Sequence, residues 1–259
     1  MNTVRTVSDT KRAFYTLHTR PVSSVYRRVV EELMVEIHLL RVNQDFRYDP
    51  IFALGVVSTF DRFMEGYEPA TDRDSIFNAL CRAEEIDPAQ FRADAQMAQA
   101  SVRGRNNEDL KTWVEQSAAS GGADLAGTLY NIAHNATFKY SRLFAIGLYV
   151  LLETVDADLV SEEAKLNEMV EQLSVPLNVS ASKIQKDLEL YRSNLDKLQQ
   201  ARKAMAEFIE GERRRQQQRI EEQQKKPQRH LNPRNLTQQT PLLKSPHRCI
   251  FPCQPFPSP

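Results

Sequence analysis

The stretch FKYSRLFAIGLYVLLE, residues 138–153, decides how this chain folds. Ten consecutive residues within it, Leu143 to Leu152, carry neither a charge nor an amide side chain. As a helix they span about 15 Å, whereas a helix that crosses a membrane needs about twenty apolar residues. Charged residues bound the run, with Arg142 before it and Glu153 after it. Because a helix that is apolar all round is usually buried, we expect this segment to be the central helix of a bundle.

The helical period extends over most of the first 180 residues. Apolar residues recur at spacings of three and four between Val22 and Ile37, which predicts an amphipathic helix of roughly twenty residues. Asp-Pro pairs at 49–50 and 87–88 predict two helix starts, because aspartate caps a first turn and proline fits its first position. We therefore predict an all-α fold, with a multi-helix globular bundle over residues 1–180.

Two helix boundaries are less sharply defined by the sequence. Ser8 is a candidate cap for a short first helix that ends near Arg20. An apolar stripe from Leu125 to Leu151 predicts either one long helix or two helices broken near Thr137. In both cases the apolar run belongs to a longer amphipathic pattern, which argues against a membrane anchor.

From about residue 182 the apolar pattern changes to heptads, with Arg202 as the one polar residue in the series. The series consists of Ile184, Leu188, Tyr191, Leu195, Leu198, Met205 and Ile209. Such a repeat predicts a coiled-coil-like seam. We expect one long helix over residues 181–226 whose C-terminal half projects from the bundle. The last segment, 227–259, has eight prolines and no acidic residue, which predicts a disordered basic, proline-rich tail.

The zero net charge hides an asymmetry, since residues 211–259 contain ten Lys or Arg against three Glu. Arg213, Arg214 and Arg215 are therefore candidates for a surface-electrostatic role. The basic arm is explained as a solvated helix end, or as a site for anionic lipid or an acidic partner. Nucleic acid is the least favoured partner, because the arm has no aromatic residue for base stacking before Phe251.

No arrangement of residues in the sequence predicts catalysis. The Ser-x-x-Lys at 180–183 lacks the companion motifs of serine acyltransferases, and its serines are explained as caps of the long helix. Glu36 and His38 are two residues apart, about 200° around a helix, so they do not form the Glu-x-x-His of di-iron bundles. We expect His38 to be a buried or boundary residue and predict no catalytic residue and no cofactor.

The three cysteines do not indicate a disulfide framework or a metal site. Cys81 lies in a helical pattern and is predicted to be a small buried residue. Cys249 and Cys253 have no second pair that would complete a zinc site. The first twelve residues lack the apolar segment of a signal peptide, so we do not expect secretion. The ten-residue apolar run is too short to span a bilayer, so we expect no transmembrane helix.

Four stretches of the chain resemble the thylakoid formation protein family. They are RTVSDTKRAFYTLHTRP at 5–21, YRRVVEELMVEIHLL at 26–40, DPIFALGVVSTFDRFMEGY at 49–67 and FKYSRLFAIGLYVLLE at 138–153. The resemblance is only compositional beyond about Glu210. Because no import leader precedes these stretches, we expect a cyanobacterial member.

The resemblance implies a non-enzymatic adaptor in thylakoid membrane biogenesis and in photosystem II assembly and repair. Its expected partner is the FtsH protease complex, which it would bind and stabilise, with photosystem II assembly intermediates and the membrane surface as further candidates. It would act peripherally at the cytoplasmic side of the thylakoid membrane and in the cytoplasm, without a small-molecule substrate. The alternative function is a self-associating coiled-coil protein whose basic arm binds a membrane surface or, less favoured, nucleic acid.

Two sets of residues are candidates for contact with a partner. The first is a basic patch, for which a merely solvated face is the rival explanation: Arg27, Arg28, Lys139 and Arg142. The second set applies if the heptad seam pairs with a partner rather than folding back on its own domain: Tyr191, Arg202 and Met205.

Overall fold

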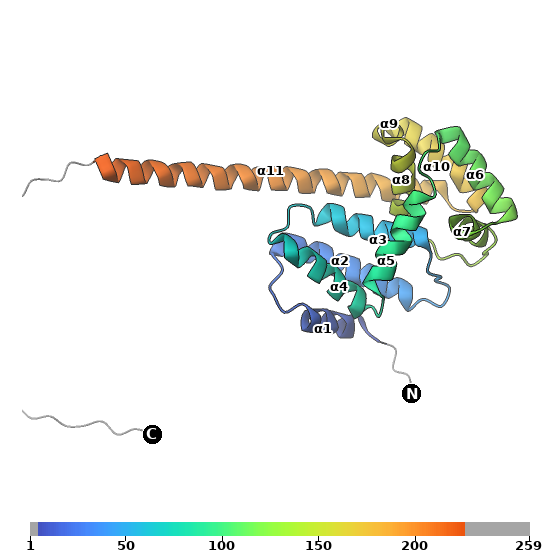
Figure 1. The fold of residues 1–259 in the computed structure, drawn as a ribbon, viewed down its shortest axis with the longest axis horizontal. Helices are drawn as coiled ribbons and strands as arrows, with labels where there is room; N and C mark the ends of the chain where they lie inside the picture. The colour runs from blue at the N-terminus through green and yellow to red at the C-terminus, as the bar shows by residue number, and fades with distance from the viewer. Residues whose placement is uncertain (1–4, 226–259) are drawn as a thin grey trace, which may run out of the picture. The chain divides into compact units, whose positions relative to one another are not determined.

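The computed structural model describes residues 5–225, which form eleven helices and no strand within that range (Figure 1). They are α1 (Val7–Leu17), α2 (Ser24–Arg41), α3 (Pro50–Phe63), α4 (Ala70–Ala83), α5 (Pro88–Ala100), α6 (Asn107–Ser120), α7 (Asp124–Ala133), α8 (Arg142–Val155), α9 (Ala157–Ser161), α10 (Glu163–Leu177) and α11 (Ala181–Lys225). The predicted all-α fold is confirmed. The predicted tail, 227–259, lies outside the described residues.

Helices α3 and α5 begin at the two Asp-Pro pairs, as predicted. The Asp49 side chain accepts a hydrogen bond of 2.8 Å from the Phe52 backbone N–H, and Asp87 caps α5 in the same way. The first helix differs from the prediction, because Thr6 rather than Ser8 is its cap. Thr6 and Asp9 exchange side-chain to backbone hydrogen bonds in a capping box, which satisfies two donors that the first turn would leave unpaired.

The apolar stripe of residues 125–151 forms two helices rather than one. α7 ends at Ala133 and α8 starts at Arg142, so the break includes the predicted position near Thr137. Ser141 caps α8 by accepting a hydrogen bond of 3.0 Å from the Phe144 N–H. The side chain of Lys139 is exposed in the segment between these helices.

All ten residues of the apolar run, 143–152, are buried in α8, which confirms its predicted central position. α8 packs against α3, and a glycine from each helix allows a close crossing. A Cβ atom built on Gly147 would lie 1.9 Å from the Ile51 carbonyl oxygen, and one on Gly55 would lie 1.8 Å from the Leu143 oxygen. Among the described residues, no helix is long and apolar enough to cross a membrane.

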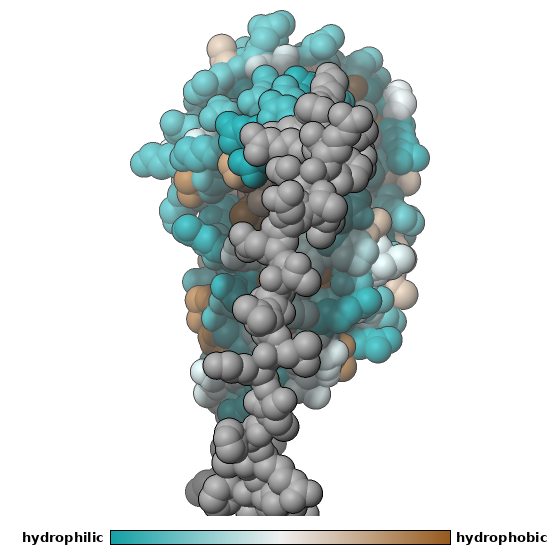
Figure 2. Space-filling model, turned by 90° about the vertical axis from the view of Figure 1, so that its left-hand side faces the viewer, coloured by the Kyte–Doolittle hydropathy of each residue, from teal (hydrophilic) through white to brown (hydrophobic). Residues whose placement is uncertain are grey.

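The other helices surround this central pair in two groups (Figure 1). α1 packs on both α2 and α4, and α2 also contacts α3. α6, α7 and α10 pack on one another, while α5 bridges toward them from α3 through contacts with α7 and α8. The result is a single core that extends through both groups. On the face shown in Figure 2, the coloured surface is mostly hydrophilic, with small apolar patches.

Helix α11 is continuous over 45 residues. Up to Met205 it belongs to the same compact unit as the ten preceding helices, and residues from Ala206 onward form a second unit. Ile184, Leu188 and Tyr191 are buried, so the first part of the heptad seam folds back on its own domain. This is one of the two alternatives that the sequence left open.

Candidate functional site

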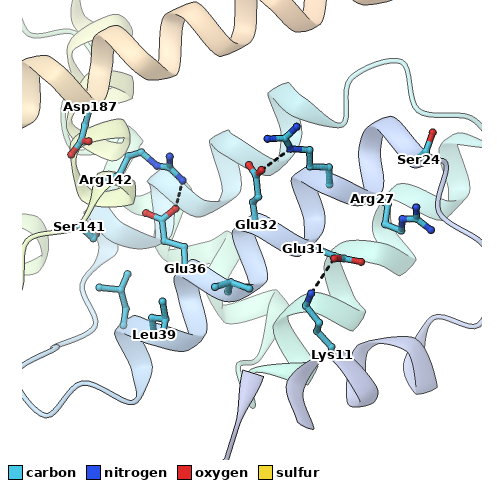
Figure 3. Close-up of a pocket in the computed structure, with 13 residues that line it drawn as sticks. Lys11, Ser24, Arg27, Glu31, Glu32, Glu36, Leu39, Ser141, Arg142 and Asp187 are labelled. Atoms are coloured by element: carbon cyan, nitrogen blue, oxygen red, sulfur yellow. Dashed lines mark hydrogen bonds and ion pairs between the residues drawn. The ribbon is translucent and has the colours of Figure 1, made fainter. Parts of the chain in front are cut away.

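A groove of about 1010 Å³ runs along α2 and brings together three of the four residues of the predicted basic patch. Arg27 and Arg28 line it from α2, and Arg142 lines it from the start of α8 (Figure 3). Lys139 does not line it. We call this feature the α2 groove. Its walls come from α1 on one side and from α8 and α11 on the other.

One end of the α2 groove is held by a partly buried ion pair. Arg142 donates a hydrogen bond of 2.6 Å to the carboxylate of Glu36, whose side chain is only 19% exposed. Burial raises the pKa of Glu36, Arg142 opposes the rise, and the nearby charge of Asp187 adds to it. Asp187 in turn accepts a hydrogen bond of 2.6 Å from the Tyr140 hydroxyl. This network joins α2, α8 and α11.

The other end of the α2 groove is more exposed. Lys11 of α1 and the Tyr15 hydroxyl donate hydrogen bonds of 3.0 and 2.8 Å to Glu31, and these bonds lower the pKa of that carboxyl. Arg28 pairs with Glu32 one turn further along α2, at 2.8 Å. Arg27, by contrast, forms no ion pair within residues 5–225. It is therefore a cation of the groove that is available to a partner.

The candidates on α11 are placed differently from one another. The Tyr191 ring is buried, with the Phe63 and Tyr149 rings at 5.9 and 6.0 Å. The Arg202 guanidinium donates hydrogen bonds to the backbone carbonyls of Arg62 and Phe63, at 3.3 and 2.9 Å. Both carbonyls belong to the last turn of α3, where the helix itself supplies no donor; the Arg62 oxygen also accepts a longer hydrogen bond of 3.4 Å from the Glu65 backbone N–H just beyond the helix.

We expect Arg202→Met to cost about 1–2 kcal/mol of unfolding free energy, because two carbonyls at the negative end of the α3 dipole lose a charged donor. Urea denaturation of the purified protein measures this loss. Lys203→Met, an exposed neighbour with the same change in charge, is the control and should have little effect. Equal stability of the two variants would contradict the capping role.

Met205 and the three arginines of the basic arm are exposed. Met205 retains 61% of its surface. Arg214 pairs with Glu210 at 3.1 Å and Arg215 pairs with Glu212 at 2.9 Å, both within one turn of the second unit. Exposed pairs of this kind contribute little to stability. The electrostatic role of Arg213, Arg214 and Arg215 stays a prediction.

Sequence reasoning missed the acidic residues Glu36 and Asp187 as parts of this site. A signal was present, because each lies on the apolar side of its helix. Glu36 is three residues after Leu33 and four before Leu40, and both of those leucines are buried. A carboxylate at such a position needs a partner from another element, and Arg142 supplies it for Glu36.

The described residues offer charged recognition rather than an evident reaction centre. Within them no group of three His, Cys, Asp or Glu residues is placed to hold a metal ion. Cys81 is buried as predicted, and burial raises the pKa of its thiol to about 12, so it is not a thiolate nucleophile at neutral pH. His38 is also buried, with its Nδ1 atom 3.0 Å from the Thr10 hydroxyl.

Comparison with known proteins points to one family. Residues 6–220 match the family model described as thylakoid formation protein. The chain is 56% identical over 214 residues to Protein Thf1 of Acaryochloris marina, an alignment that covers 83% of this chain and 87% of that relative. It is 57% identical over 215 residues to Protein Thf1 of Nostoc punctiforme, covering 83% and 92%. A solved structure of Psb29 has a TM-score of 0.72 and 51% identity, covering 82% of this chain and 98% of that one.

Proposed function

Because this chain belongs to the thylakoid formation protein family, we propose that it is a non-enzymatic adaptor that binds and stabilises the FtsH protease complex. Membership supports a role in thylakoid biogenesis. In this proposal the adaptor takes part, through the protease, in the assembly and repair of photosystem II. In this proposal the adaptor works peripherally at the cytoplasmic side of the thylakoid membrane, and photosystem II assembly intermediates are further partners.

The α2 groove is the observation that carries this proposal. Its lining alternates cations and carboxylates, and such patterns select a complementary protein surface more than they add raw affinity. Arg27 has no ion-pair partner in the described structure, and Leu39 at the other end is 57% exposed. An exposed apolar side chain at one end of the groove and a free cation at the other are suited to a protein partner that offers an apolar anchor and a carboxylate.

The test is a charge reversal in the groove. Arg27→Glu combined with Arg28→Glu should weaken co-purification with FtsH about tenfold, because like charges then face the partner's carboxylates. Arg28 is exposed and its pair with Glu32 contributes only a few tenths of a kcal/mol, so the fold should be kept. The matched control is Arg82→Glu with Arg103→Glu, two exposed arginines that line none of the pockets described.

Three outcomes separate the possibilities. A selective loss in the groove variant supports both the adaptor function and its location. If both variants bind FtsH equally well, the contact must lie on another surface of the protein. Normal FtsH levels and normal photosystem II repair under strong light in a strain that lacks the gene would refute the adaptor function itself.

Self-association is the second candidate function, favoured by the exposed continuation of the α11 seam. Met205 and Ile209 are 61% and 59% exposed, although they continue the register of the buried Tyr191. Pairing of these positions with a second copy would cover them. Analytical ultracentrifugation distinguishes the candidates, since a strict monomer at tens of micromolar excludes this one.

A further inference from the structure

A second cavity, separate from the α2 groove, lies where the end of α2 meets the starts of α3 and α5. Its volume is about 380 Å³. Four aromatic rings line it: Phe46, Tyr48, Phe52 and Phe91. Known small-molecule sites are concave, mostly apolar and of about 300–1,000 Å³, with a few polar groups that orient the ligand. We call this feature the aromatic cavity.

The rings of the aromatic cavity hold one another in place. Phe52 and Phe91 belong to the core and are only 1% exposed. The Phe46 ring meets Phe52 edge to face at 5.0 Å, and Tyr48 lies 5.4 Å from Phe91. The edge-to-face arrangement of Phe46 and Phe52 is favoured by the charge distribution of aromatic rings. A further ring entering the cavity would meet the same kind of surface.

The Tyr48 side chain forms one wall of the cavity and is held in position by its hydroxyl group, although 46% of its surface is exposed. Its hydroxyl donates a short hydrogen bond of 2.5 Å to Asp94 of α5. Gln90, which also lines the cavity, donates to the other oxygen of the same carboxylate at 2.7 Å. The Tyr48 ring therefore does not need to be ordered by a ligand, which lowers the entropic cost of binding.

The loop that carries Phe46 and Tyr48 is also tied down. Arg47 donates hydrogen bonds to the backbone carbonyls of Gln44 and Phe46, at 2.7 and 2.9 Å. The Asn43 side chain accepts a hydrogen bond of 2.9 Å from the Asp45 N–H, which forms a local turn. The cavity is thus preformed by its own chain.

The charges at the mouth leave one group without a partner. Glu85 is paired with Arg5 at 3.0 Å, and Asp87 is engaged in capping α5. Arg41 is exposed and forms no ion pair within residues 5–225. Burial raises the pKa of Glu84 to about 7 and Arg41 opposes that rise, but the two groups do not form an ion pair. The mouth therefore presents a free cation.

We propose that the aromatic cavity binds a small aromatic anion, with its ring among Phe46, Tyr48 and Phe91 and its anionic group at Arg41. The ligand's ring would pack against the aromatic walls, and its anionic group would pair with the Arg41 guanidinium. A guanidinium is a strong hydrogen-bonding partner for carboxylate, sulfonate or phosphate oxygens. This site is independent of the proposed FtsH contact. Binding here could proceed when the α2 groove is altered.

Two dyes of related structure test the proposal on the full chain. The anionic probe is 1-anilinonaphthalene-8-sulfonate, and the neutral probe is N-phenyl-1-naphthylamine; both fluoresce strongly in apolar sites. Arg41→Gln should weaken binding of the anionic dye roughly 3–10-fold while leaving the neutral dye unchanged, because only one of the two pairs with the guanidinium. Arg103→Gln, an exposed arginine outside the cavity, should change neither.

Two further variants locate the bound ring. Tyr48→Ala should weaken both dyes, whereas Tyr48→Phe keeps the ring and should retain most of the binding. Phe208→Ser removes an exposed ring of α11 that could bind dyes non-specifically. The proposal is overturned if Arg41→Gln and Arg103→Gln behave alike, or if the signal is lost in Phe208→Ser instead of Tyr48→Ala. Since Arg41 is exposed, its variant should fold even if Tyr48→Ala does not.

Discussion

Replacing Gly147 by alanine is expected to remove most of the stability of the protein. The added methyl group would lie 1.9 Å from the Ile51 carbonyl oxygen of α3, far inside van der Waals contact. The nearest atoms are backbone, so no side chain can rotate away to make room. α3 and α8 would have to separate, which opens the centre of the core.

We expect Gly147→Ala to lower the free energy of unfolding by about 4–5 kcal/mol or more. The total free energy of unfolding of a typical domain is about 5–15 kcal/mol. Thermal and urea unfolding followed by circular dichroism measure this decrease. Gly55→Ala, at the facing position, should have a similar effect, since its methyl group would lie 1.8 Å from the Leu143 oxygen. The double variant should cost less than the sum of the two, because helices already separated no longer clash at the second position.

Gly211→Ala provides the control for this experiment. Gly211 is also inside a helix, but an added Cβ would meet nothing within 4 Å. Alanine favours a helix by roughly 0.5–1 kcal/mol over glycine, so this variant should gain helical stability in α11. Replacing glycine by alanine is therefore expected to lower the free energy of unfolding at Gly147 and to raise helix stability at Gly211. Unchanged unfolding of Gly147→Ala would refute the close crossing of α3 and α8.

The second large effect is a dependence of stability on pH that arises from Glu84. This carboxyl is buried, and burial raises its pKa from 4.5 to about 7. His38 Nδ1 lies 3.6 Å from it and Arg41 acts on it from a greater distance, both from α2. Its Oε1 atom has no hydrogen-bond partner among residues 5–225. Ionised Glu84 is thus poorly compensated.

The sign follows from proton binding. Between about pH 4.5 and 7 the folded protein retains a proton on Glu84 that the unfolded chain has released. Stability from this group is therefore fully present below the ordinary pKa and is lost as pH rises toward 7. A shift of this size corresponds to about 3 kcal/mol. Asp49, whose pKa burial raises to about 6, acts in the same direction.

Glu84→Gln tests this expectation, because the amide cannot ionise. The variant should lose most of the decline in unfolding free energy between pH 5 and 8, and at pH 8 it should be more stable than the parent chain. Glu115→Gln, an exposed position on α6, should keep the parent's pH profile. Parallel profiles for the parent and Glu84→Gln would contradict the assignment to Glu84.

The sequence predicted features that depend on neighbours in the chain. The apolar run of α8 and the Asp-Pro starts are local signals, and the structure confirms them. Gly147 stands out within the apolar run, but its partner Gly55 is about ninety residues earlier and no local rule connects them. The pair of Arg142 with Glu36 joins residues 106 apart. Such long-range contacts follow from the packing of helices and not from the periodicity of any one of them.

Arg202 also makes a long-range contact that the local pattern of the sequence does not reveal. Its position in the heptad series made it a candidate for contact with a partner, on the condition that the seam pairs with a partner and does not fold back on its own domain. In the structure its guanidinium is engaged with carbonyls of α3 that are 139 and 140 residues earlier. A polar residue in an apolar seam is equally compatible with a partner protein and with a helix end of the same chain. Only the three-dimensional arrangement distinguishes the two.

The contact between Arg202 and α3 also limits when the fold can be completed while the chain is being synthesised. Translation adds about 5–20 residues per second, so 140 residues separate the two partners by roughly 7–28 s. During that interval the end of α3 must be hydrated, and the core lacks Ile184, Leu188 and Tyr191, which are buried in the finished protein. The N-terminal helices of the nascent chain therefore cannot complete their packing until α11 has been synthesised, and the protein reaches its final fold only after nearly all of its described chain has been made.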